Sequence, residues 1–179
     1  MTIYMLRHTH PKIDKGICYG NSDVELADSF EKEWIEISSK ISTISFDIIF
    51  SSPLQRCTIL AEKICPPNKQ IILDDRLKEL NFGKWELKKW DEIYKSPESK
   101  KWFNNFINEP APGGESYQDL INRVTNFVDY LKTLKKNNKI LIITHAGVIR
   151  AAYSILKNHP KKSSFDLKIG YGQLFSFQI

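Results

Sequence analysis

Histidine and arginine, two side chains well suited to handling phosphate, occur directly after short apolar runs of this sequence. Two of the four histidines and three of the five arginines fall at or shortly after such points. The apolar runs are typical of buried strands, and ligands of parallel sheets collect just beyond the carboxyl ends of the strands. Four groups of polar residues are therefore candidates for one site: Arg7-His8, Ser51-Ser52 with Arg56, Arg76 with Glu79, and Thr144-His145-Ala146-Gly147.

These residue types predict a site for a tetrahedral oxyanion such as a phosphoryl group. The planar guanidinium of arginine matches phosphate oxygens, and the free N–H groups of a helix N-terminus attract anions. Positive charge around a histidine keeps its imidazole neutral, and a neutral imidazole is a nucleophile. We expect a phosphoryl group to pass to a ring nitrogen and then to water. Glu79 stands where a carboxylic acid is needed to protonate the leaving oxygen.

These polar groups can meet at one edge of a sheet only if a strand precedes each of them. Continuous apolar runs predict strands at 3–6, 46–50, 70–73 and 139–144, and the last is typical of a strand buried on both faces. The tail predicts one or two further strands, at Phe165–Ile169 and Leu174–Phe177.

Helical spacing of apolar residues predicts helices between the strands. We expect Asp28 to cap a helix that runs from Phe30 to Ile41, and Ser51-Ser52-Pro53 to open a second that reaches about Cys65. A long helix follows Ser116 and carries apolar residues as far as Leu134, and another spans Ala146–Leu156. The aromatic-rich stretch 81–112 predicts short helices.

Strands that alternate with helices predict an α/β fold. The expected architecture is a three-layer α/β/α sandwich, in which helices cover both faces of a mostly parallel sheet. No linker, repeat or low-complexity segment divides the 179 residues, so we expect one domain over residues 1–179.

Composition excludes several classes of protein. The chain is 41% hydrophobic and 26% charged, as ordinary globular proteins are, and no apolar run is long enough to span a membrane. The first apolar stretch is too short for a secretion signal, and three cysteines without a C-x-x-C pair indicate free thiols, so we expect a cytoplasmic protein. The net charge of +5 comes mostly from lysines in surface clusters, and without a nucleic-acid-binding motif we expect no nucleic-acid partner.

Four segments, in order, resemble the motifs of the histidine phosphatase superfamily, in its phosphoglycerate mutase-like branch. They are R-H-T at 7–9, S-S-P-L-Q-R at 51–56, L-K-E-L-N-F-G-K-W-E at 77–86 and T-H-A-G at 144–147. The resemblance covers most of the chain and implies the phosphoglycerate mutase-like sandwich. It also implies that His8 becomes phosphohistidine and that Glu79 is the proton donor. The groups that it implies as the phosphate clamp are Arg7, Arg56 and His145, with the backbone N–H of Ala146 as a further donor.

A narrower resemblance concerns the substrate. The segments R-H-T-H-P at 7–11, G-I-C-Y-G-N-S-D-V-E-L at 16–26 and P-G-G-E-S at 112–116 resemble the α-ribazole phosphatase group of cobalamin synthesis. This resemblance implies hydrolysis of α-ribazole 5′-phosphate, with Tyr19 and Gly20 where relatives contact the substrate. Thr9 and Leu87 replace glycines that are common in the family, and these changes bear on substrate choice more than on catalysis.

Three alternatives stay open: a phosphoglycerate mutase, a broad-specificity phosphatase of small molecules, and a non-catalytic protein that binds phosphorylated ligands. Mutases resemble this chain less, because they carry a longer middle segment that helps enclose a bisphosphate. Arg76, Arg123 and Arg150 are expected to be structural or surface residues. Two arginines beside two histidines repel a cation, so we expect no metal ion and no cofactor. The expected partner is a small phosphate ester.

Overall fold

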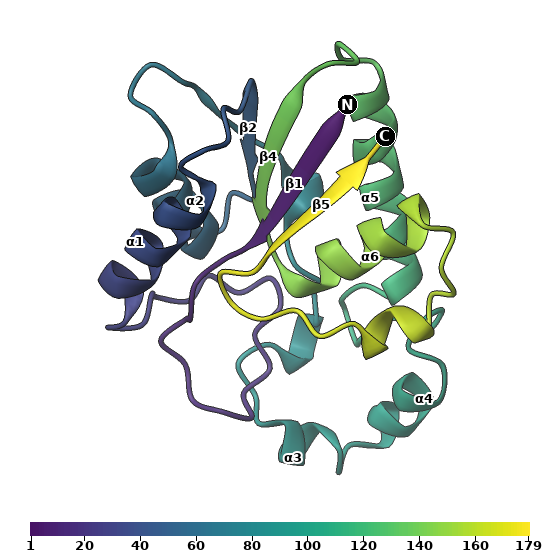
Figure 1. Cartoon of the computed structure of the whole chain (residues 1–179). Coiled ribbons are helices and arrows are strands. Elements are labelled where there is room, and N and C mark those ends of the chain that lie inside the picture. The colour runs from purple at the N-terminus through teal and green to yellow at the C-terminus, as the bar shows by residue number, and fades with distance from the viewer.

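Five short apolar segments pair into one sheet, in the order β3-β2-β4-β1-β5, in a computed structural model that describes all residues from 1 to 179 (Figure 1). The strands are β1 (Thr2–Arg7), β2 (Ile48–Ser51), β3 (Ile71–Leu73), β4 (Lys139–Thr144) and β5 (Leu174–Gln178). Strands β1 to β4 run parallel, and β5 is antiparallel to β1 at the edge. Because β4 lies between β1 and β2, the carboxyl ends of these three strands are neighbours.

Helices cover both faces of this sheet. Helices α1 (Phe30–Ile41) and α2 (Gln55–Ile64) lie on one face, and α5 (Tyr117–Lys132) and α6 (Ala146–Leu156) lie on the other (Figure 1). The predicted three-layer α/β/α architecture is confirmed. The short helices α3 (Trp90–Ile93) and α4 (Pro97–Asn105) lie beyond the carboxyl ends of the parallel strands (Figure 1). No helix has both the length and the apolar composition that crossing a bilayer requires.

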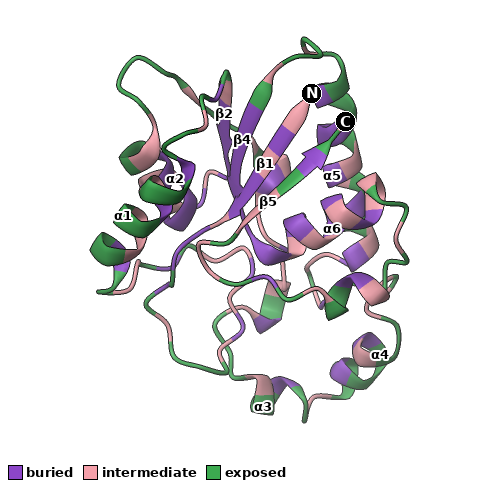
Figure 2. Ribbon diagram, in the orientation of Figure 1, coloured by how far each residue is buried: buried purple, intermediate pink, exposed green.

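The central position of β4 in the sheet explains why its residues 140–143 are all apolar. Ile140 and Ile142 pack into the core under α5 and α6, whereas Leu141 and Ile143 pack into the core under α1 and α2. All four side chains are at most 1% exposed, and strand β4 is buried throughout this stretch (Figure 2). Burial of each such side chain contributes about 1.5–3 kcal/mol to folding. The predicted strand therefore lies at the centre of the molecule, between the two hydrophobic cores.

A third, aromatic cluster lies beyond the end of the sheet. Trp85, Ile93 and Trp102 pack there around Cys18, with Phe82, Trp90 and Phe103 against them. Cys18 exchanges backbone hydrogen bonds with this segment: its N–H donates to the Lys88 carbonyl (2.9 Å) and its carbonyl accepts from the Leu87 N–H (2.6 Å). The aromatic stretch therefore holds the loop that carries Tyr19 and Gly20.

One predicted helix cap and one predicted helix start are wrong. Helix α1 has Ser29 at its N-cap, and the exposed Asp28 only approaches Lys12, with 3.9 Å between Oδ1 and Nζ. Ser51 does not open α2, because it continues the ladder of β2 opposite Leu73 and Ile143. The helix begins at Gln55, after Pro53.

Two predicted ends also differ. Helix α5 ends at Lys132 and not at Leu134, because the Thr133 N–H turns back to the Tyr130 carbonyl (3.0 Å) and tightens the last turn. The tail forms one strand, β5, and the other candidate segment, 165–169, is not a strand. The segment Ser163–Asp166 is a 3-10 turn, in which the Phe165 ring packs against those of Phe106 and Tyr117, both at 4.8 Å between centroids.

Candidate active site

His8 follows β1, and its surroundings keep its ring neutral. Its Nδ1 lies 2.7 Å from the Thr9 carbonyl oxygen, and because a carbonyl only accepts, Nδ1 carries the proton. Burial, followed by the charges of Arg56 and Arg7, holds the pKa of His8 well below its usual value. The ring is therefore uncharged near neutral pH, and Nε2 keeps its lone pair.

His145 follows β4 at the N-cap of α6 and lies beside His8. The two ring centroids are 5.1 Å apart, and His145 is fully buried. Its Nε2 lies 2.8 Å from the Ser52 hydroxyl, while its Nδ1 is buried without a hydrogen-bond partner. Burial and the charge of Arg56 hold the pKa of His145 well below its usual value. This ring too is neutral.

Arg56 lies in the first turn of α2 and is fully buried, yet no carboxylate pairs with it. Its Nη1 donates to the Ser22 carbonyl and its Nη2 to the Gly20 carbonyl, both at 2.7 Å, and its Nε is buried without a partner. A buried charge held only by neutral carbonyls is costly without a counter-ion. An anion bound beside the guanidinium would supply the missing charge.

Arg7 ends β1 and, like Arg56, has no carboxylate partner. Its Nη1 donates to the Ile169 carbonyl (2.6 Å), its guanidinium carbon lies 3.7 Å from the centroid of the Tyr171 ring, and its Nε is buried without a partner. Tyr171, which sequence reasoning did not single out, also bonds through its hydroxyl to that of Tyr19 (2.6 Å). The loop that carries it is fixed by the Gly172 N–H, which donates to the carbonyls of Arg7 and His8.

Glu79 reaches the same cavity as His8 from the segment after β3. Its Oε1 accepts from the Leu80 N–H (3.0 Å) and its Oε2 from the Gly147 N–H (3.1 Å). A side chain on residue 147 would collide with this carboxylate, so the glycine of T-H-A-G lets the Glu79 carboxylate approach the helix N-terminus in its observed position. Ala146 opens α6 one residue earlier, where backbone N–H groups lack carbonyl partners within the helix.

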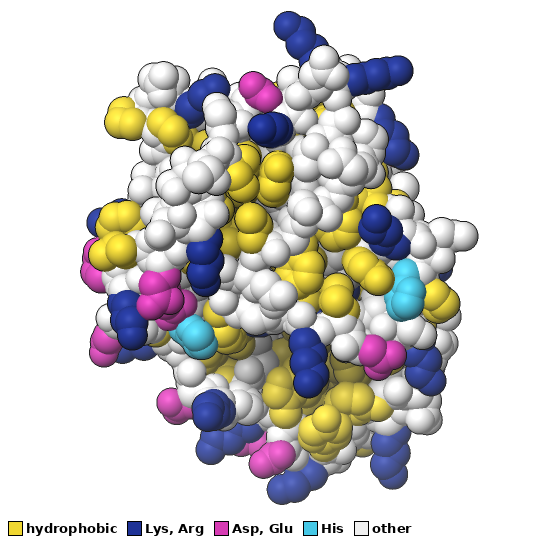
Figure 3. Space-filling model, in the orientation of Figure 1, with side chains coloured by type: hydrophobic (Ala, Val, Ile, Leu, Met, Phe, Trp, Pro, Cys, Tyr) yellow, Lys and Arg dark blue, Asp and Glu magenta, His cyan; other side chains and the backbone are white.

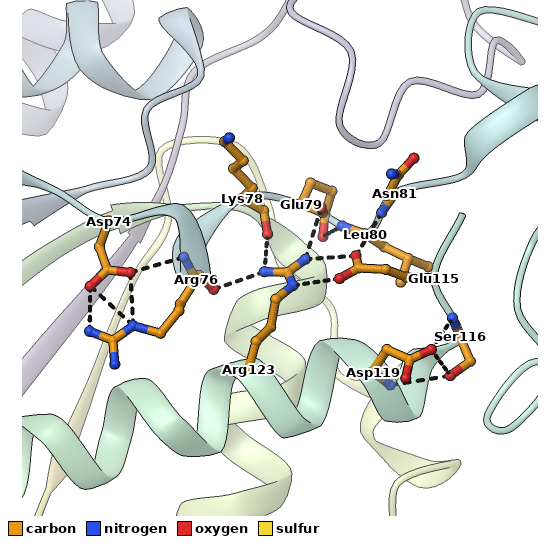
Figure 4. Close-up of polar contacts among 10 residues, drawn as sticks. All are labelled: Asp74, Arg76, Lys78, Glu79, Leu80, Asn81, Glu115, Ser116, Asp119 and Arg123. Carbon is orange, nitrogen blue, oxygen red and sulfur yellow. Dashed lines mark hydrogen bonds and ion pairs between the residues drawn. The ribbon is translucent and has the colours of Figure 1, made fainter. Parts of the chain in front are cut away.

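The segment that carries Glu79 is held by Arg123 of α5 (Figure 4). The Arg123 guanidinium donates to three carbonyls in succession, those of Arg76 (2.8 Å), Lys78 (2.6 Å) and Glu79 (3.0 Å). Its Nε also lies 2.8 Å from a carboxylate oxygen of Glu115, and Arg76 pairs with Asp74 at 2.6 Å. Arg123 and Arg76 are thus structural, in agreement with the sequence-based interpretation.

Arg150 departs from that interpretation, because it lines the cavity with Arg7 and Arg56. Its Nη2 donates to the Leu167 carbonyl (3.3 Å), its guanidinium carbon lies 5.5 Å from the centroid of Phe165, and no carboxylate pairs with it. Burial lowers the pKa of Arg150. A sequence signal existed: Arg150 stands one helical turn after Ala146, on the side of α6 that the predicted phosphate donors occupy.

The cavity itself has a volume of about 700 Å³ and is open to solvent. Its wall includes the charged side chains of Arg7, Arg56, Arg150 and Glu79, together with the neutral ring of His8. The rest of its wall is largely apolar or aromatic: Ile17, Cys18, Tyr19, Leu80, Phe82, Trp90, Tyr117, Leu120 and Phe165. Figure 3 shows hydrophobic side chains around a hollow at this end of the molecule.

Tyr19 and Gly20 both line this cavity, but in different ways. Tyr19 contributes part of the aromatic wall, whereas Gly20 contributes the carbonyl that holds Arg56. A Cβ on residue 20 would overlap the Leu80 carbonyl oxygen and the Phe82 ring, which explains the glycine. His145 and Ala146 do not line this cavity, but the His145 ring lies next to that of His8.

Comparisons with known proteins agree with this geometry. The model of the histidine phosphatase superfamily (branch 1) matches residues 3–179. Phosphoserine phosphatase 1 of Hydrogenobacter thermophilus is 28% identical over 161 residues, which cover 86% of this chain and 75% of that protein. Probable phosphoglycerate mutase GpmB of Erwinia tasmaniensis is 25% identical over 175 residues, which cover 94% and 80% of the two chains.

Among solved structures, the α-ribazole phosphatase of Shigella flexneri superposes with a TM-score of 0.92 at 21% identity, over 100% of this chain and 91% of that one. At this identity the likeness shows a shared fold, of the phosphoglycerate mutase type that the sequence motifs imply. The chain belongs to branch 1 of the histidine phosphatase superfamily, and its site is that of a phosphoric monoester hydrolase.

Proposed function

We propose that the protein hydrolyses phosphate monoesters through a phosphohistidine at Nε2 of His8. The observation that carries this proposal is the Nδ1–H of His8 on the Thr9 carbonyl, which leaves the Nε2 lone pair beside arginines that have no carboxylate partner. In the first step the Nε2 lone pair attacks phosphorus, an N–P bond forms and the P–O ester bond breaks. In the second step water attacks phosphorus, the N–P bond breaks, and phosphate leaves.

Glu79 is the proposed acid and base of these two steps. Its carboxylic acid protonates the leaving alcohol oxygen in the first step, and the carboxylate takes a proton from the attacking water in the second. The backbone N–H groups of Leu80 and Gly147 fix the carboxyl group at the cavity wall. The proposed phosphate clamp consists of Arg7, Arg56, His145 and the Ala146 N–H.

We further propose α-ribazole 5′-phosphate as the substrate, a reaction that belongs to cobalamin biosynthesis. The largely apolar wall of the cavity, with Tyr19, Phe82 and Trp90, offers flat surfaces to an aromatic base beside the phosphate clamp. The sequence segments at 7–11, 16–26 and 112–116 support the same substrate. The open mouth of the cavity admits water, which favours hydrolysis over transfer to a second acceptor.

A second candidate is supported by Arg150. Phosphoserine and phosphoglycerate carry a carboxylate besides the phosphate, and Arg150 is a third cavity cation without a carboxylate partner. The names of two relatives concern these substrates. α-Ribazole 5′-phosphate has no second anionic group, so the choice between the candidates can be made by experiment.

The test is a substrate panel at matched pH and salt. We expect kcat/KM for α-ribazole 5′-phosphate to exceed that for phosphoserine, 3-phosphoglycerate and p-nitrophenyl phosphate, and we expect no loss of activity in EDTA. Equal values across the panel indicate a broad-specificity phosphatase. Interconversion of 2- and 3-phosphoglycerate faster than phosphate release indicates a mutase. Phosphate binding without turnover of any ester indicates a non-catalytic binder.

A further inference from the structure

The neighbours of His145 determine which of its two ring nitrogens carries the proton. A neutral imidazole has one N–H, and either ring nitrogen can carry it. At one end of His145, Nε2 meets the Ser52 hydroxyl at 2.8 Å and the Cys57 sulfur at 3.6 Å. At the other end, Nδ1 is buried and has no partner. The position of the proton therefore decides what His145 offers to a phosphoryl group on His8.

The Ser52 hydroxyl also accepts a weak bond from the Leu54 N–H (3.4 Å). Its own proton then needs an acceptor, because Ser52 is fully buried and an unsatisfied hydroxyl is costly there. The available acceptors are Nε2 of His145 and the Cys57 sulfur, and sulfur is a weak acceptor. If Nε2 carried the proton and donated it to Ser52, the Ser52 proton would be left with the sulfur alone.

The reverse arrangement satisfies every group when phosphate is bound. The Ser52 hydroxyl donates to Nε2, the ring proton lies on Nδ1, and Nδ1–H meets an oxygen of the phosphoryl group. With the other tautomer, the Nδ1 lone pair would face those oxygens and repel them.

We propose that Ser52 is a positioning residue that fixes the Nδ1–H tautomer of His145 and so turns that ring into a hydrogen-bond donor for the phosphoryl group. The proposal rests on the function proposed above, since it assumes that phosphate binds between the two histidines. Ser52 itself does not touch the substrate. It acts through His145, and its position follows from the register of β2 against β4, which sets Ser51 opposite Ile143 and lets the Ser52 N–H donate to the Ile143 carbonyl.

The tautomer can be observed without turnover, by ¹⁵N NMR of the imidazole nitrogens in the phosphate-free protein, where Ser52 and not a bound anion sets the position of the proton. Protonated and unprotonated ring nitrogens resonate far apart, and the chain has only four histidines. We expect wild-type His145 to carry its proton on Nδ1. Because the wild-type spectrum answers the question, the test does not depend on any variant folding.

Variants then assign the effect to Ser52. In Ser52→Ala we expect the proton to move to Nε2 and the inhibition constant for inorganic phosphate to rise roughly tenfold, as loss of one charge-assisted hydrogen bond requires. The matched control is Ser51→Ala, since the equally buried Ser51 hydroxyl donates to the Ser52 carbonyl (2.9 Å) and does not contact His145.

Cys57→Ala should leave the tautomer in place, because Ser52 remains. An Nε2–H tautomer in the wild-type protein, or an unchanged tautomer in Ser52→Ala, would overturn the proposal. A protein that binds phosphate with the expected tautomer but hydrolyses no ester would count against the proposed function and not against the role of Ser52.

Discussion

Replacement of Arg56 by methionine separates the contribution of this side chain to folding from its contribution to phosphate binding. Arg56 is fully buried, donates two hydrogen bonds of 2.7 Å to carbonyls, and has no carboxylate partner. Methionine fills a similar volume without a charge, so the variant removes the positive charge and leaves the core packed.

The effect on folding is the difference of two opposing contributions. Each charge-assisted bond to a carbonyl stabilises by about 1.5–3 kcal/mol, and the uncompensated buried charge costs several kcal/mol. We therefore expect the free energy of unfolding to change by no more than about 2 kcal/mol. For the binding of a phosphoryl group, in contrast, no opposing contribution offsets the lost charge. Loss of a buried charge partner costs about 3–5 kcal/mol, which corresponds to roughly 10²–10⁴-fold in kcat/KM.

Thermal unfolding with and without inorganic phosphate measures both quantities. At a hundredfold excess over its Kd, phosphate stabilises the wild-type protein by about 2.7 kcal/mol, which raises Tm by roughly 5–10 °C in a protein of this size. In Arg56→Met we expect Tm without phosphate to stay close to the wild-type value and the increase with phosphate to disappear. A large loss of stability together with an undiminished phosphate effect would show that Arg56 is a structural residue, and the account of the clamp would be wrong.

Three further predictions concern other groups of the site. The pKa of buried His8 is lowered, so unfolded chains bind protons that folded chains do not; urea unfolding should show stability falling below about pH 6.5, and His8→Asn should flatten part of that slope. In Glu79→Gln, rapid-quench assays should show roughly 10²-fold slower phosphoryl transfer from alkyl phosphates but a nearly unchanged burst from p-nitrophenyl phosphate, whose leaving group needs no proton; equal slowing contradicts an acid role. In Arg150→Gln, kcat/KM for phosphoserine should fall about tenfold more than for p-nitrophenyl phosphate; equal losses would exclude a carboxylate-binding role for Arg150.

The sequence was sufficient to predict His8 and His145 as members of one site, because two rules act together. Unbroken apolar runs mark strands buried on both faces, and parallel strands bring their carboxyl ends to the same edge. The structure places both rings there, 5.1 Å apart. The same two rules predict Arg56 and Glu79 as members of the site, because each lies a few residues beyond a strand.

Arg150, Tyr171 and the contact between Ser52 and His145 illustrate what local reasoning leaves out. The helix that carries Arg150 was predicted, but the side of α6 that faces the cavity depends on how α6 packs against α5 and β1. Tyr171 lies in a loop without periodicity, and its place beside Arg7 is set by backbone bonds of Gly172 to residues far away in the sequence. The contact of Ser52 with His145 depends on strand register, which no single segment encodes.

The proposed mechanism requires His8 to carry a phosphoryl group. Its most direct test is to mix the enzyme with an excess of substrate, quench within milliseconds, and locate the phosphate by mass spectrometry and by its stability. We predict one acid-labile, base-stable phosphoryl group on His8, absent from His8→Asn, which should also lack turnover. Turnover by His8→Asn, or a phosphoryl group on any residue other than His8, would contradict the account.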